Sequence, residues 1–487
     1  MSSVTRLEFT LNGQSIQTTV SPTARLSDVL RNQCNSKDVK VGCNAGDCGA
    51  CSVLIDGEVV CACITAVGQV RGRSVETLVG LIADEPLTQK LSESFLEKGA
   101  AQCGICIPGM LVSATALLRS TAQPDQNQVQ DALGGVLCRC TGYRKIIDAV
   151  VGANSAESHS ASDNGISGSP LGIGIQRVDG LQKVSGTDSF GDDVAPGDAL
   201  VLKVIRSPHH HAAFELGDME LFVKQNPGIV TVLTSKDIPG SNAFGVIPPF
   251  IDQPVFAEAE TRFRGEAIAA IVGEAVAIAQ LDTTDFPVVW SPLDAWLDVD
   301  AAQEANAALL HSDKANNVMC RGYVCKGDVD SALQNAAHQA TTEIVTGFVE
   351  HAYIEPEAGY AIRRGDELSV FGCTQAPYMD RDSLALILGL NPEQVRIVPT
   401  STGGGFGSKL DLSFQPFIAL AAWTLGRAVR INYTRQESLQ SSTKRHPAAM
   451  TFSAGVDHQG KLTGVRFDGT FNTGAYASWG PTVANRV

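Results

Sequence analysis

The sequence predicts a multidomain α+β protein, and three observations support this fold class. The chain has 487 residues, more than a single hydrophobic core usually holds, so we expect two to four domains. Ten of its 13 cysteines precede residue 141, which distinguishes the N-terminal part from the rest. From residue 171 onward, strand-like apolar runs alternate with alanine-rich helical segments, which is typical of mixed α/β structure.

Composition and charge exclude several classes of protein. Hydrophobic residues make up 44% of the chain and charged residues 18%, as in globular proteins and unlike disordered or fibrous ones. The longest apolar stretch, 267–280, is interrupted by Glu274 and is shorter than the roughly 20 residues that span a bilayer. The N-terminus lacks the pattern of a secretion signal, so we expect a cytoplasmic protein. The net charge is −15, of which residues 156–487 carry −14, so nucleic acid is not an expected partner.

The first cysteine set lies in VGCNAGDCGACSVLIDG and the strand that follows it. Its spacing is C-x4-C-x2-C with a later fourth cysteine: Cys43, Cys48, Cys51 and then Cys61 or Cys63. This is the spacing of plant-type [2Fe–2S] sites, and glycines between the cysteines let backbone N–H groups point at the sulfurs. Cys61 and Cys63 share one predicted strand and one face, so either can reach the cluster. Metal ligation explains these residues better than disulfides do in a chain without a secretion signal.

A second set consists of two short-spaced pairs: Cys103, Cys106, Cys138 and Cys140. Zinc is the alternative to an iron–sulfur cluster, because paired cysteines are common in zinc sites. The sequence predicts helices over 111–118 and 129–137, with Pro108 and Asp125 at their starts. The first pair then lies beside a helix N-terminus, where the helix dipole favours thiolates. Two helices that each present a pair of ligands favour a compact iron–sulfur cluster.

These motifs together resemble the two iron–sulfur domains of the xanthine oxidase (molybdenum hydroxylase) family. The segments that carry the resemblance are VGCNAGDCGACSVLIDGEVVCAC, AQCGICIPGM and LCRCTGYRKIIDAV. It implies a β-grasp, ferredoxin-like [2Fe–2S] domain over 1–75 and a helical-bundle [2Fe–2S] domain over 76–155. By the family spacing, Cys63 is the fourth ligand of the first cluster, Cys61 is extra, and the second set holds the second cluster.

The same resemblance extends past the cysteines. It implies that Gln102 touches the pterin of the molybdenum cofactor and that Cys140 lies on the electron route. The segment VGANSAESHSASDNGISGSP is rich in Ser, Gly, Ala and Asn, which predicts a linker over 156–172. Residues 173–487 resemble the N-terminal, incomplete part of the molybdenum-cofactor-binding domain. A flavin domain has no room between them, so the layout is most similar to flavin-free bacterial aldehyde oxidoreductases, with no FAD in this chain.

The glycine-rich sequence GGGFGSK at 403–409 has three possible interpretations. It fits a dinucleotide fingerprint poorly because Ser408 replaces the third glycine, and a phosphate loop would need glycine before Lys409. A plain tight turn is the structural alternative. Within the family, this loop brings backbone N–H groups of Phe406 and Gly407 toward an oxo ligand of molybdenum. The resemblance therefore implies four cofactor-binding residues here: Gly404, Gly405, Phe406 and Gly407.

The acid–base candidates lie in GFVEHAYIEPEAGYA. Glu350, His351 and Glu355 form either an acid–base site or, as the resemblance implies, a support beside the cofactor. The family usually has glutamine two positions before this histidine, where this chain has Val349, which changes how the oxo ligand is hydrogen-bonded. No residue in 171–487 matches the family's general-base glutamate, so the catalytic residue is unassigned. Either the chain is truncated or a second polypeptide completes the site.

Two residues bear on the choice of substrate. Leu410 follows Lys409 where relatives specialised for purines carry glutamate and aldehyde-oxidising relatives carry an apolar residue. Trp479 matches a second pocket-lining aromatic residue of the aldehyde enzymes. An apolar wall attracts a flat apolar substrate but leaves polar ring atoms without partners, which disfavours purines.

The resemblance implies a molybdenum-dependent hydroxylase. Such an enzyme oxidises an aldehyde or similar electron-poor carbon with oxygen from water and sends the electrons through two [2Fe–2S] clusters to an external flavoprotein or ferredoxin. Its cofactor is molybdopterin, with or without an added nucleotide, and we expect an oligomer. N-heteroaromatic compounds such as purines are the alternative substrates. A noncatalytic iron–sulfur electron-transfer subunit is the alternative of another class.

Overall fold

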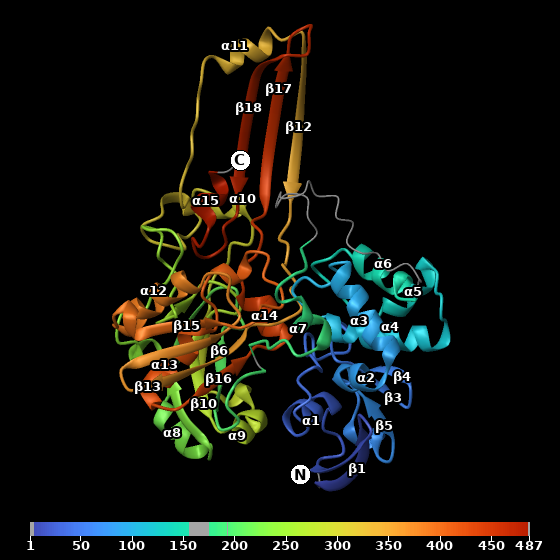
Figure 1. Ribbon diagram of the computed structural model, residues 1–487. Coiled ribbons are helices and arrows are strands. Elements are labelled where there is room, and N and C mark those ends of the chain that lie inside the picture. Colours follow the sequence, from blue (N-terminus) through green and yellow to red (C-terminus); the bar gives the residue numbers. More distant parts are fainter. Residues whose placement is uncertain (1–3, 155–174, 192, 486–487) are drawn as a thin grey trace.

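The computed structural model describes residues 4–154, 175–191 and 193–485. The N-terminal part, blue to cyan in Figure 1, lies beside a larger body built on a seven-stranded sheet, and three long strands extend from this body as an arm. The predicted linker over 156–172 lies outside the described residues. Within the described part of the chain, no helix has both the length and the apolar character needed to cross a membrane.

A five-stranded sheet with one helix across it forms the first unit. Its strand order is β2-β1-β5-β3-β4, with β1 and β5 parallel and the other neighbours antiparallel. Alternate residues of β1, namely Leu7, Phe9 and Leu11, are buried against the apolar side of α1, as period-2 patterning requires. This arrangement confirms the predicted ferredoxin-like fold. The elements are β1 Thr5–Leu11, β2 Gln14–Val20, α1 Leu26–Asn32, β3 Ser52–Ile55, β4 Glu58–Cys61, η1 Val67–Val70 and β5 Ser74–Glu76.

A helical unit follows, with its own apolar core. The expected N-cap of the fourth of its helices is present, because Asp125 accepts the Gln128 N–H at 2.9 Å in a capping box. The predicted helix over 129–137 is too long, because the helix ends at Leu133 before two consecutive glycines. The helices are α2 Leu78–Asp84, α3 Pro86–Glu97, α4 Ile107–Ser120, α5 Gln126–Leu133 and α6 Arg144–Gly152.

The first two units touch backbone to backbone at glycines. A Cβ atom at Gly49 would lie 2.1 Å from the Gly135 carbonyl oxygen, and one at Gly109 would lie 2.4 Å from the Gly49 carbonyl oxygen. Only residues without a side chain fit at such distances. The two cysteine-bearing parts of the chain are therefore packed as closely as their backbones allow.

The body is a mixed sheet of strand order β15-β14-β13-β16-β6-β10-β8, with helices on both faces. Residues of β6 alternate between two cores, since Leu200, Leu202 and Val204 pack toward α12 and α13, whereas Ile205 packs toward α8 and α9. Two of the strand-like apolar runs that follow residue 171, 199–205 and 229–233, correspond to β6 and β8. A smaller sheet, β11-β7-β9, lies beside them.

The body contains the following elements before residue 340: α7 Gly180–Ser185, β6 Leu200–Arg206, β7 Ala212–Leu216, α8 Met219–Gln225, β8 Ile229–Leu233, η2 Ser235–Asp237, β9 Glu260–Thr261, β10 Ala267–Gly273, α9 Ala275–Gln280, η3 Thr283–Asp285, β11 Val288–Pro292, α10 Val299–Ala302 and η4 Ala315–Asn317. The later elements are β13 Ala358–Arg364, β14 Glu367–Gly372, α12 Pro377–Leu388, η5 Pro392–Gln394, β15 Val395–Pro399, η6 Ser408–Leu410, α13 Gln415–Leu425, β16 Val429–Asn432, α14 Arg435–Ser441 and α15 Gly480–Ala484.

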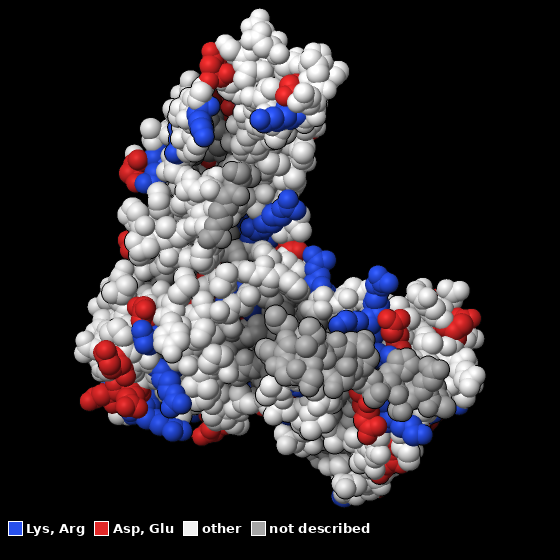
Figure 2. Space-filling model, turned by 45° about the horizontal axis from the view of Figure 1, so that its top comes forward, with Lys and Arg blue, Asp and Glu red and all other residues white. Residues whose placement is uncertain are grey.

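The arm is a three-stranded antiparallel sheet, β12-β17-β18, with a short helix near its tip (Figure 1). Apolar side chains lie on its surface; Val345 is 81% exposed and Ile344 is 48% exposed. Much of the arm is uncharged on the face that Figure 2 shows, and basic and acidic side chains are interspersed elsewhere on that face. A cavity of about 1550 Å³ lies at the base of the arm. The elements are β12 His338–Thr346, β17 Ala448–Val456, β18 Leu462–Phe471 and α11 Val329–Gln334.

Buried charges join the first unit to the chain that follows residue 175. Asp193 accepts hydrogen bonds from Arg31 Nη2 and Lys40 Nζ, each at 2.8 Å, and all three side chains are at most 7% exposed. Burial by itself raises the pKa of Asp193, but the charges of Lys40 and Arg31 outweigh it and hold that pKa below its ordinary value. The carboxylate is therefore ionised at neutral pH and cross-links the two parts.

Replacement of this carboxylate should destabilise the protein in a pH-dependent way. Asp193→Asn removes a buried carboxylate that pairs with two buried cations, so we expect the free energy of unfolding to fall by about 3 kcal/mol at neutral pH. The native pKa lies below the unfolded value of about 3.9, so the contribution is complete above about pH 5 and is lost as the pH falls through the native pKa. Urea denaturation of both proteins at several pH values measures the difference.

The matched control is Asp56→Asn, which breaks an ion pair with Arg73 whose side chains are 43% and 48% exposed. Exposed pairs contribute little, so no measurable loss is expected. A loss of equal size in both variants, or one that stays constant into the acid range for Asp193→Asn, would contradict the account.

Candidate functional site

The first cysteine set surrounds the loop between α1 and β3. Three backbone N–H groups donate to Cys43 Sγ at 3.3 Å each: those of Ala45, Asp47 and Cys48. Gly46, with φ of 85°, and Gly49, with φ of 66°, turn the chain around this sulfur through backbone conformations that favour glycine. The predicted loop with N–H groups aimed at sulfur is present in the structure.

Two cysteines next to Cys51 are candidates for the fourth ligand of this set, Cys61 and Cys63. The Cys51 thiol hydrogen-bonds to both Cys61 and Cys63. Cys63 is buried and receives the Gly46 N–H, and its bond with Cys51 lowers the pKa of Cys63 to about 6. The expectation that the two cysteines share one strand is wrong, because β4 ends at Cys61 and a turn follows. Both thiols nevertheless reach the site, so the assignment of Cys63 stays a prediction.

The second cysteine set lies between the N-terminus of α4 and the loop from α5 to α6. Cys106 is the N-cap residue of α4, so the first pair lies beside a helix N-terminus, as the sequence predicts. The four thiols hydrogen-bond in two pairs, Cys103 with Cys140 and Cys106 with Cys138. These bonds lower the pKa of Cys138 to about 5 and the pKa of Cys140 to about 7. Each pair therefore readily supplies a thiolate, the form that binds metal.

The cysteines of both sets are available as metal ligands, because every cysteine of the chain is a free thiol. In the described ranges, no group of three or more Cys, His, Asp and Glu side chains is arranged around a single metal-ion position. A [2Fe–2S] cluster is held by four cysteine thiolates, the number that each set supplies.

The two cysteine sets are neighbours in space and are connected by a backbone hydrogen bond. The Leu137 N–H donates to the Cys48 carbonyl oxygen at 2.9 Å, and Leu137 directly precedes Cys138. Cys48 also belongs to a buried apolar cluster with four further members: Ala50, Ile105, Phe190 and Ile354. A short covalent route interrupted by one hydrogen bond therefore connects a predicted ligand of each cluster.

Glu355 holds the GGGFGSK loop through two hydrogen bonds of its carboxylate. Glu355 Oε2 accepts the Gly403 N–H at 2.6 Å and Lys409 Nζ at 3.0 Å, and both side chains are at most 5% exposed. Burial alone lowers the pKa of Lys409, but the surrounding acidic groups, Glu355 and Glu357 among them, outweigh it and raise that pKa above its ordinary value. Glu355 therefore holds the loop in place, and the structure separates it from Glu350 and His351.

The GGGFGSK loop consists mostly of glycine, so its backbone is not covered by side chains. Gly404 has φ of 94° and Phe406 has φ of 52°, so the chain reverses tightly here. A Cβ at Gly405 would lie 2.4 Å from Gln375 Oε1. The Gly407 N–H, which the resemblance directs toward an oxo ligand, donates to the same Gln375 oxygen at 3.0 Å. Gln375 is thus a neighbour of the loop that the sequence analysis missed, because nothing in its local sequence marks it.

A cavity of about 970 Å³ opens in front of this loop. Its lining includes seven of the residues singled out from the sequence: Val349, Glu350, His351, Phe406, Gly407, Leu410 and Trp479. It also includes Arg139, whose Nε donates to the His351 carbonyl oxygen at 3.0 Å and which the sequence analysis missed. Its position between Cys138 and Cys140 could have marked it. Gln102 is exposed and lies outside this lining, next to Cys103.

Three groups give the cavity its polarity. Glu350 pairs with Lys444 at 2.6 Å, and burial lowers the pKa of His351, so this imidazole is neutral at pH 7. Asp411 is only 7% exposed; burial raises the pKa of Asp411 to about 6, and the Ser478 hydroxyl donates to it. The remaining wall is largely apolar, with Leu410 and Trp479 near the loop. Such a cavity suits a small, mostly apolar molecule with few polar contacts.

Four family models match consecutive parts of the chain. Residues 9–73 match the 2Fe-2S iron-sulfur cluster binding domain, and residues 77–151 match the [2Fe-2S] binding domain. Residues 185–294 match the a/b hammerhead domain of aldehyde oxidase and xanthine dehydrogenase. Residues 310–487 match the molybdopterin cofactor-binding domain. The chain therefore contains two [2Fe–2S]-binding domains and a region that matches a molybdopterin cofactor-binding domain.

Individual relatives agree with these matches. An aldehyde oxidoreductase of Megalodesulfovibrio gigas is 29% identical over 498 residues, which cover 98% of this chain and 55% of the relative. The nicotinate dehydrogenase large molybdopterin subunit of Eubacterium barkeri is 33% identical over 318 residues, 65% of this chain and 74% of the relative. The chain thus spans about half the length of the first of these.

A solved structure shows the same fold. The aldehyde oxidoreductase from Desulfovibrio gigas superimposes with a TM-score of 0.90 at 28% sequence identity, covering 98% of this chain and 55% of that one. The paired cysteine sets, the glycine loop over a cavity, the four domain matches and this superposition agree with one another. This chain belongs to the xanthine oxidase (molybdenum hydroxylase) family.

Proposed function

We propose that this chain forms part of a molybdenum hydroxylase that oxidises aldehydes, with oxygen taken from water, and passes the electrons to an external acceptor. One observation carries the proposal: the second cysteine set touches both of its neighbours. A Cβ at Gly403, in the GGGFGSK loop, would lie 3.0 Å from Ile105 Cβ, and Leu137 bonds to Cys48 of the first set. These contacts provide a route from the GGGFGSK loop through the second set to the first set, the order that stepwise electron transfer needs. The first set also packs on the molybdopterin-binding part, where a Cβ at Gly42 would lie 2.7 Å from Ile354 Cγ2.

The proposed cofactors are two [2Fe–2S] clusters and molybdopterin. The first cluster would be held by Cys43, Cys48, Cys51 and Cys63, and the second by Cys103, Cys106, Cys138 and Cys140. The molybdopterin contacts would be Gln102, Cys140, Gly404, Gly405, Phe406 and Gly407. When bound, the molybdenum cofactor supplies the two-electron oxidation with water-derived oxygen. The bounds 1–75, 76–155 and 173–487 for the three domains, with a linker over 156–172, are part of this proposal.

The chain's own residues would position the substrate and exclude water. Glu355 and Lys409 hold the GGGFGSK loop in position in the cavity wall, because both side chains are buried and form an ion pair. Leu410 and Trp479 supply apolar contact area for a flat substrate. Arg139 ties the backbone of the second cysteine set to the cavity wall at His351, so the substrate site and the electron acceptor move as one body.

The proposal includes partners. No residue of 171–487 matches the family's general-base glutamate, so we propose that a further segment or a second polypeptide supplies it. Subunit organisation is supported by the Eubacterium barkeri relative, which is itself named as a large molybdopterin subunit. The exposed apolar residues of the arm are a surface that such a segment could cover. A flavoprotein or ferredoxin would take the electrons, in a cytoplasmic and oligomeric enzyme.

A second candidate function is hydroxylation of an N-heteroaromatic compound. The observation that favours it is Asp411, a buried carboxylate in the cavity lining beside Leu410. A carboxylate can accept a hydrogen bond from a ring N–H, which an aldehyde lacks. The relative named nicotinate dehydrogenase points in the same direction.

The cluster assignment predicts the metal content and its response to substitution. The purified protein should be red-brown and carry about four irons per chain, two per cluster. Cys48→Ser and Cys106→Ser should each remove about two irons and one of two electron paramagnetic resonance signals. Cys63→Ser should also remove the first signal.

Cys61→Ser is the matched control, because Cys61 also contacts Cys51 but is not a proposed ligand. It should leave both signals in place. Zinc in place of iron, or loss of the first signal in Cys61→Ser and not in Cys63→Ser, would contradict the assignment. Full iron content without molybdenum in the complete enzyme would indicate an electron-transfer subunit without catalytic function.

The apolar wall predicts the substrate preference of the complete enzyme. kcat/KM for benzaldehyde should exceed that for hypoxanthine, because unpaired polar ring atoms cost roughly 1–3 kcal/mol each in a dry site. Leu410→Ala should lower kcat/KM for benzaldehyde about three- to tenfold, since it removes apolar contact worth about 1 kcal/mol.

Asp411→Asn is the companion variant, because it keeps an oxygen that can accept the Ser478 hydroxyl but removes the charge. It should leave benzaldehyde oxidation nearly unchanged. A preference for hypoxanthine that persists in Leu410→Ala, disappears in Asp411→Asn and increases as the pH rises through about 6, where Asp411 ionises, would establish the second candidate instead.

A further inference from the structure

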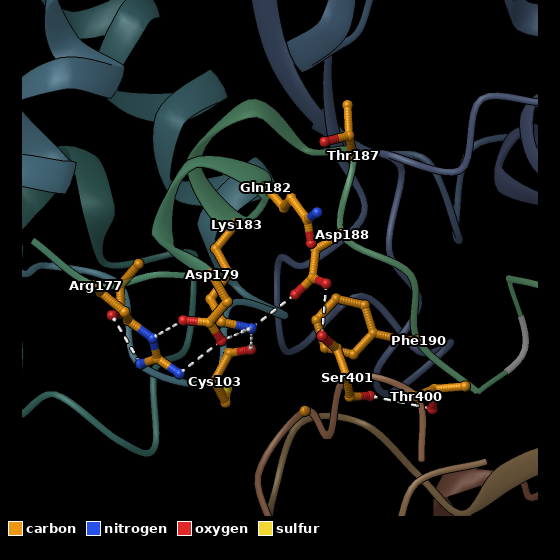
Figure 3. A network of polar contacts seen from close by, with 12 residues as sticks. Cys103, Arg177, Asp179, Gln182, Lys183, Thr187, Asp188, Phe190, Thr400 and Ser401 are labelled. Atoms are coloured by element: carbon orange, nitrogen blue, oxygen red, sulfur yellow. Dashed lines mark hydrogen bonds and ion pairs between the residues drawn. The ribbon is translucent and has the colours of Figure 1, made fainter. Parts of the chain in front are cut away.

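A buried lysine from α7 lies on the second cysteine set. Lys183 is 3% exposed, and its Nζ donates to the Cys103 carbonyl oxygen at 3.2 Å (Figure 3). The same Nζ pairs with Asp188 Oδ2 at 2.7 Å and with Asp179 at 3.4 Å. A cation that is both buried and bonded to the backbone of a proposed metal ligand acts on that ligand with little screening by water or salt.

The lysine stem and the cysteine loop fit each other closely. Gly104 has φ of 96°, and a Cβ there would lie 2.9 Å from Lys183 Cγ and 3.0 Å from Lys183 Cδ. The Ile105 N–H, one residue further on, points at the Cys103 thiol. Lys183 therefore packs along the peptide groups that surround this sulfur and holds them in the orientation that directs an N–H to it.

The counter-charges of Lys183 are placed unevenly around it. Asp188 Oδ1 accepts the Ser401 hydroxyl at 2.5 Å, so this carboxylate bonds on one side to Lys183 and on the other to the molybdopterin-binding part of the chain (Figure 3). The second carboxylate, Asp179, is 47% exposed and also binds Arg177. The cations of the network face the cysteine-bearing segment, since Lys183 Nζ bonds to the Cys103 carbonyl oxygen and Arg177 Nη1 donates to the Ala101 carbonyl oxygen at 3.5 Å. Of the two, only Lys183 bonds to a proposed ligand.

We infer that Lys183 is a positioning residue that raises the reduction potential of the second [2Fe–2S] cluster by stabilising its reduced, more negative form through the Cys103 loop. The inference rests on the proposed cluster assignment. Potentials of such clusters depend on nearby charge, on hydrogen bonds to the sulfurs and on solvent exposure, and Lys183 affects the first two directly. A higher potential at this cluster would draw electrons out of the substrate site.

The test is a redox titration of the purified, cluster-loaded chain, followed by electron paramagnetic resonance. Lys183→Met should lower the ratio of reduced to oxidised second cluster about tenfold at a fixed solution potential, a shift of about 59 mV for a one-electron couple. Lys183→Arg keeps the charge and should restore most of the ratio. The first cluster in the same sample serves as the internal reference and should not shift.

Asp188→Asn separates charge from structure, because it breaks the same ion pair but removes the negative partner. The second cluster of Asp188→Asn should become easier to reduce, so its potential should shift in the direction opposite to that of Lys183→Met. If the substitutions only loosened the packing, the potentials of both variants would shift in the same direction. Arg177→Gln removes a cation whose side chain is 46% exposed and should change the ratio less than threefold. If Lys183→Met does not assemble its second cluster, Lys183→Gln replaces it in the titration. The sign of the Asp188→Asn shift then tests the inference independently.

The outcomes distinguish this inference from the proposed function. A second signal that is present but does not respond to Lys183, or shifts of equal sign in Lys183→Met and Asp188→Asn, would overturn the inference alone. Two irons and one signal in the unaltered protein would overturn the cluster assignment and the inference with it. Opposite shifts of the second signal with an unchanged first signal would support both.

Discussion

The arrangement of this chain depends on one steric constraint, the contact between bare backbone at Gly49 and Gly135. A side chain at Gly49 would begin 2.1 Å from the Gly135 carbonyl oxygen, so anything larger than glycine must push the two units apart. The hydrogen bond from Leu137 to Cys48 lies next to this contact and would open with it. Since the position of the second cysteine set follows from that of α4 and α5, the spacing of both redox sites is determined here.

Buried carboxylates with cationic partners fix the remaining junctions. Asp193 joins the first unit to the chain after residue 175, Asp188 joins α7 to Ser401, and Glu355 joins the GGGFGSK loop to the strand region below it. Removing one member of such a pair leaves an uncompensated charge, which costs more than a lost apolar contact. These pairs therefore make the relative placement of the units specific, and the α7 pair also brings a cation onto Cys103.

The cavity and the arm differ in how their side chains are paired and exposed. In the cavity wall beside the GGGFGSK loop, Glu350 pairs with Lys444, whereas His351 Nδ1, Asp411 Oδ1 and Trp479 Nε1 are buried without a hydrogen-bond partner among the described residues. These three atoms are therefore available to a bound group. The arm in contrast carries apolar side chains such as Val345 on its surface. Exposed apolar area of this kind marks a surface for association. The two regions adjoin, because Thr346 of β12, Met450 of β17 and Phe471 of β18 line the cavity.

The sequence by itself determined the features that depend on neighbouring residues. The spacing of Cys43, Cys48 and Cys51 and the cap at Asp125 were predictable because a loop or a helix end is set by a few adjacent residues. Helix and strand ends were predicted less well, since the helix over 129–137 stops at Leu133 and Cys63 lies beyond β4. Short-range patterns do not show where pairing or packing ceases.

Only the tertiary structure decided which side chains from distant segments meet. Lys183 reaches Cys103 over 80 positions of sequence, and Arg139 reaches His351 over 212. Only the position of Arg139 between two cysteines hints at its contact, and nothing local marks Lys183, because a lysine is usually an exposed surface residue. The physical reason is that such contacts are set by how whole units pack, through glycine contacts and buried ion pairs, and a one-dimensional pattern does not contain that packing.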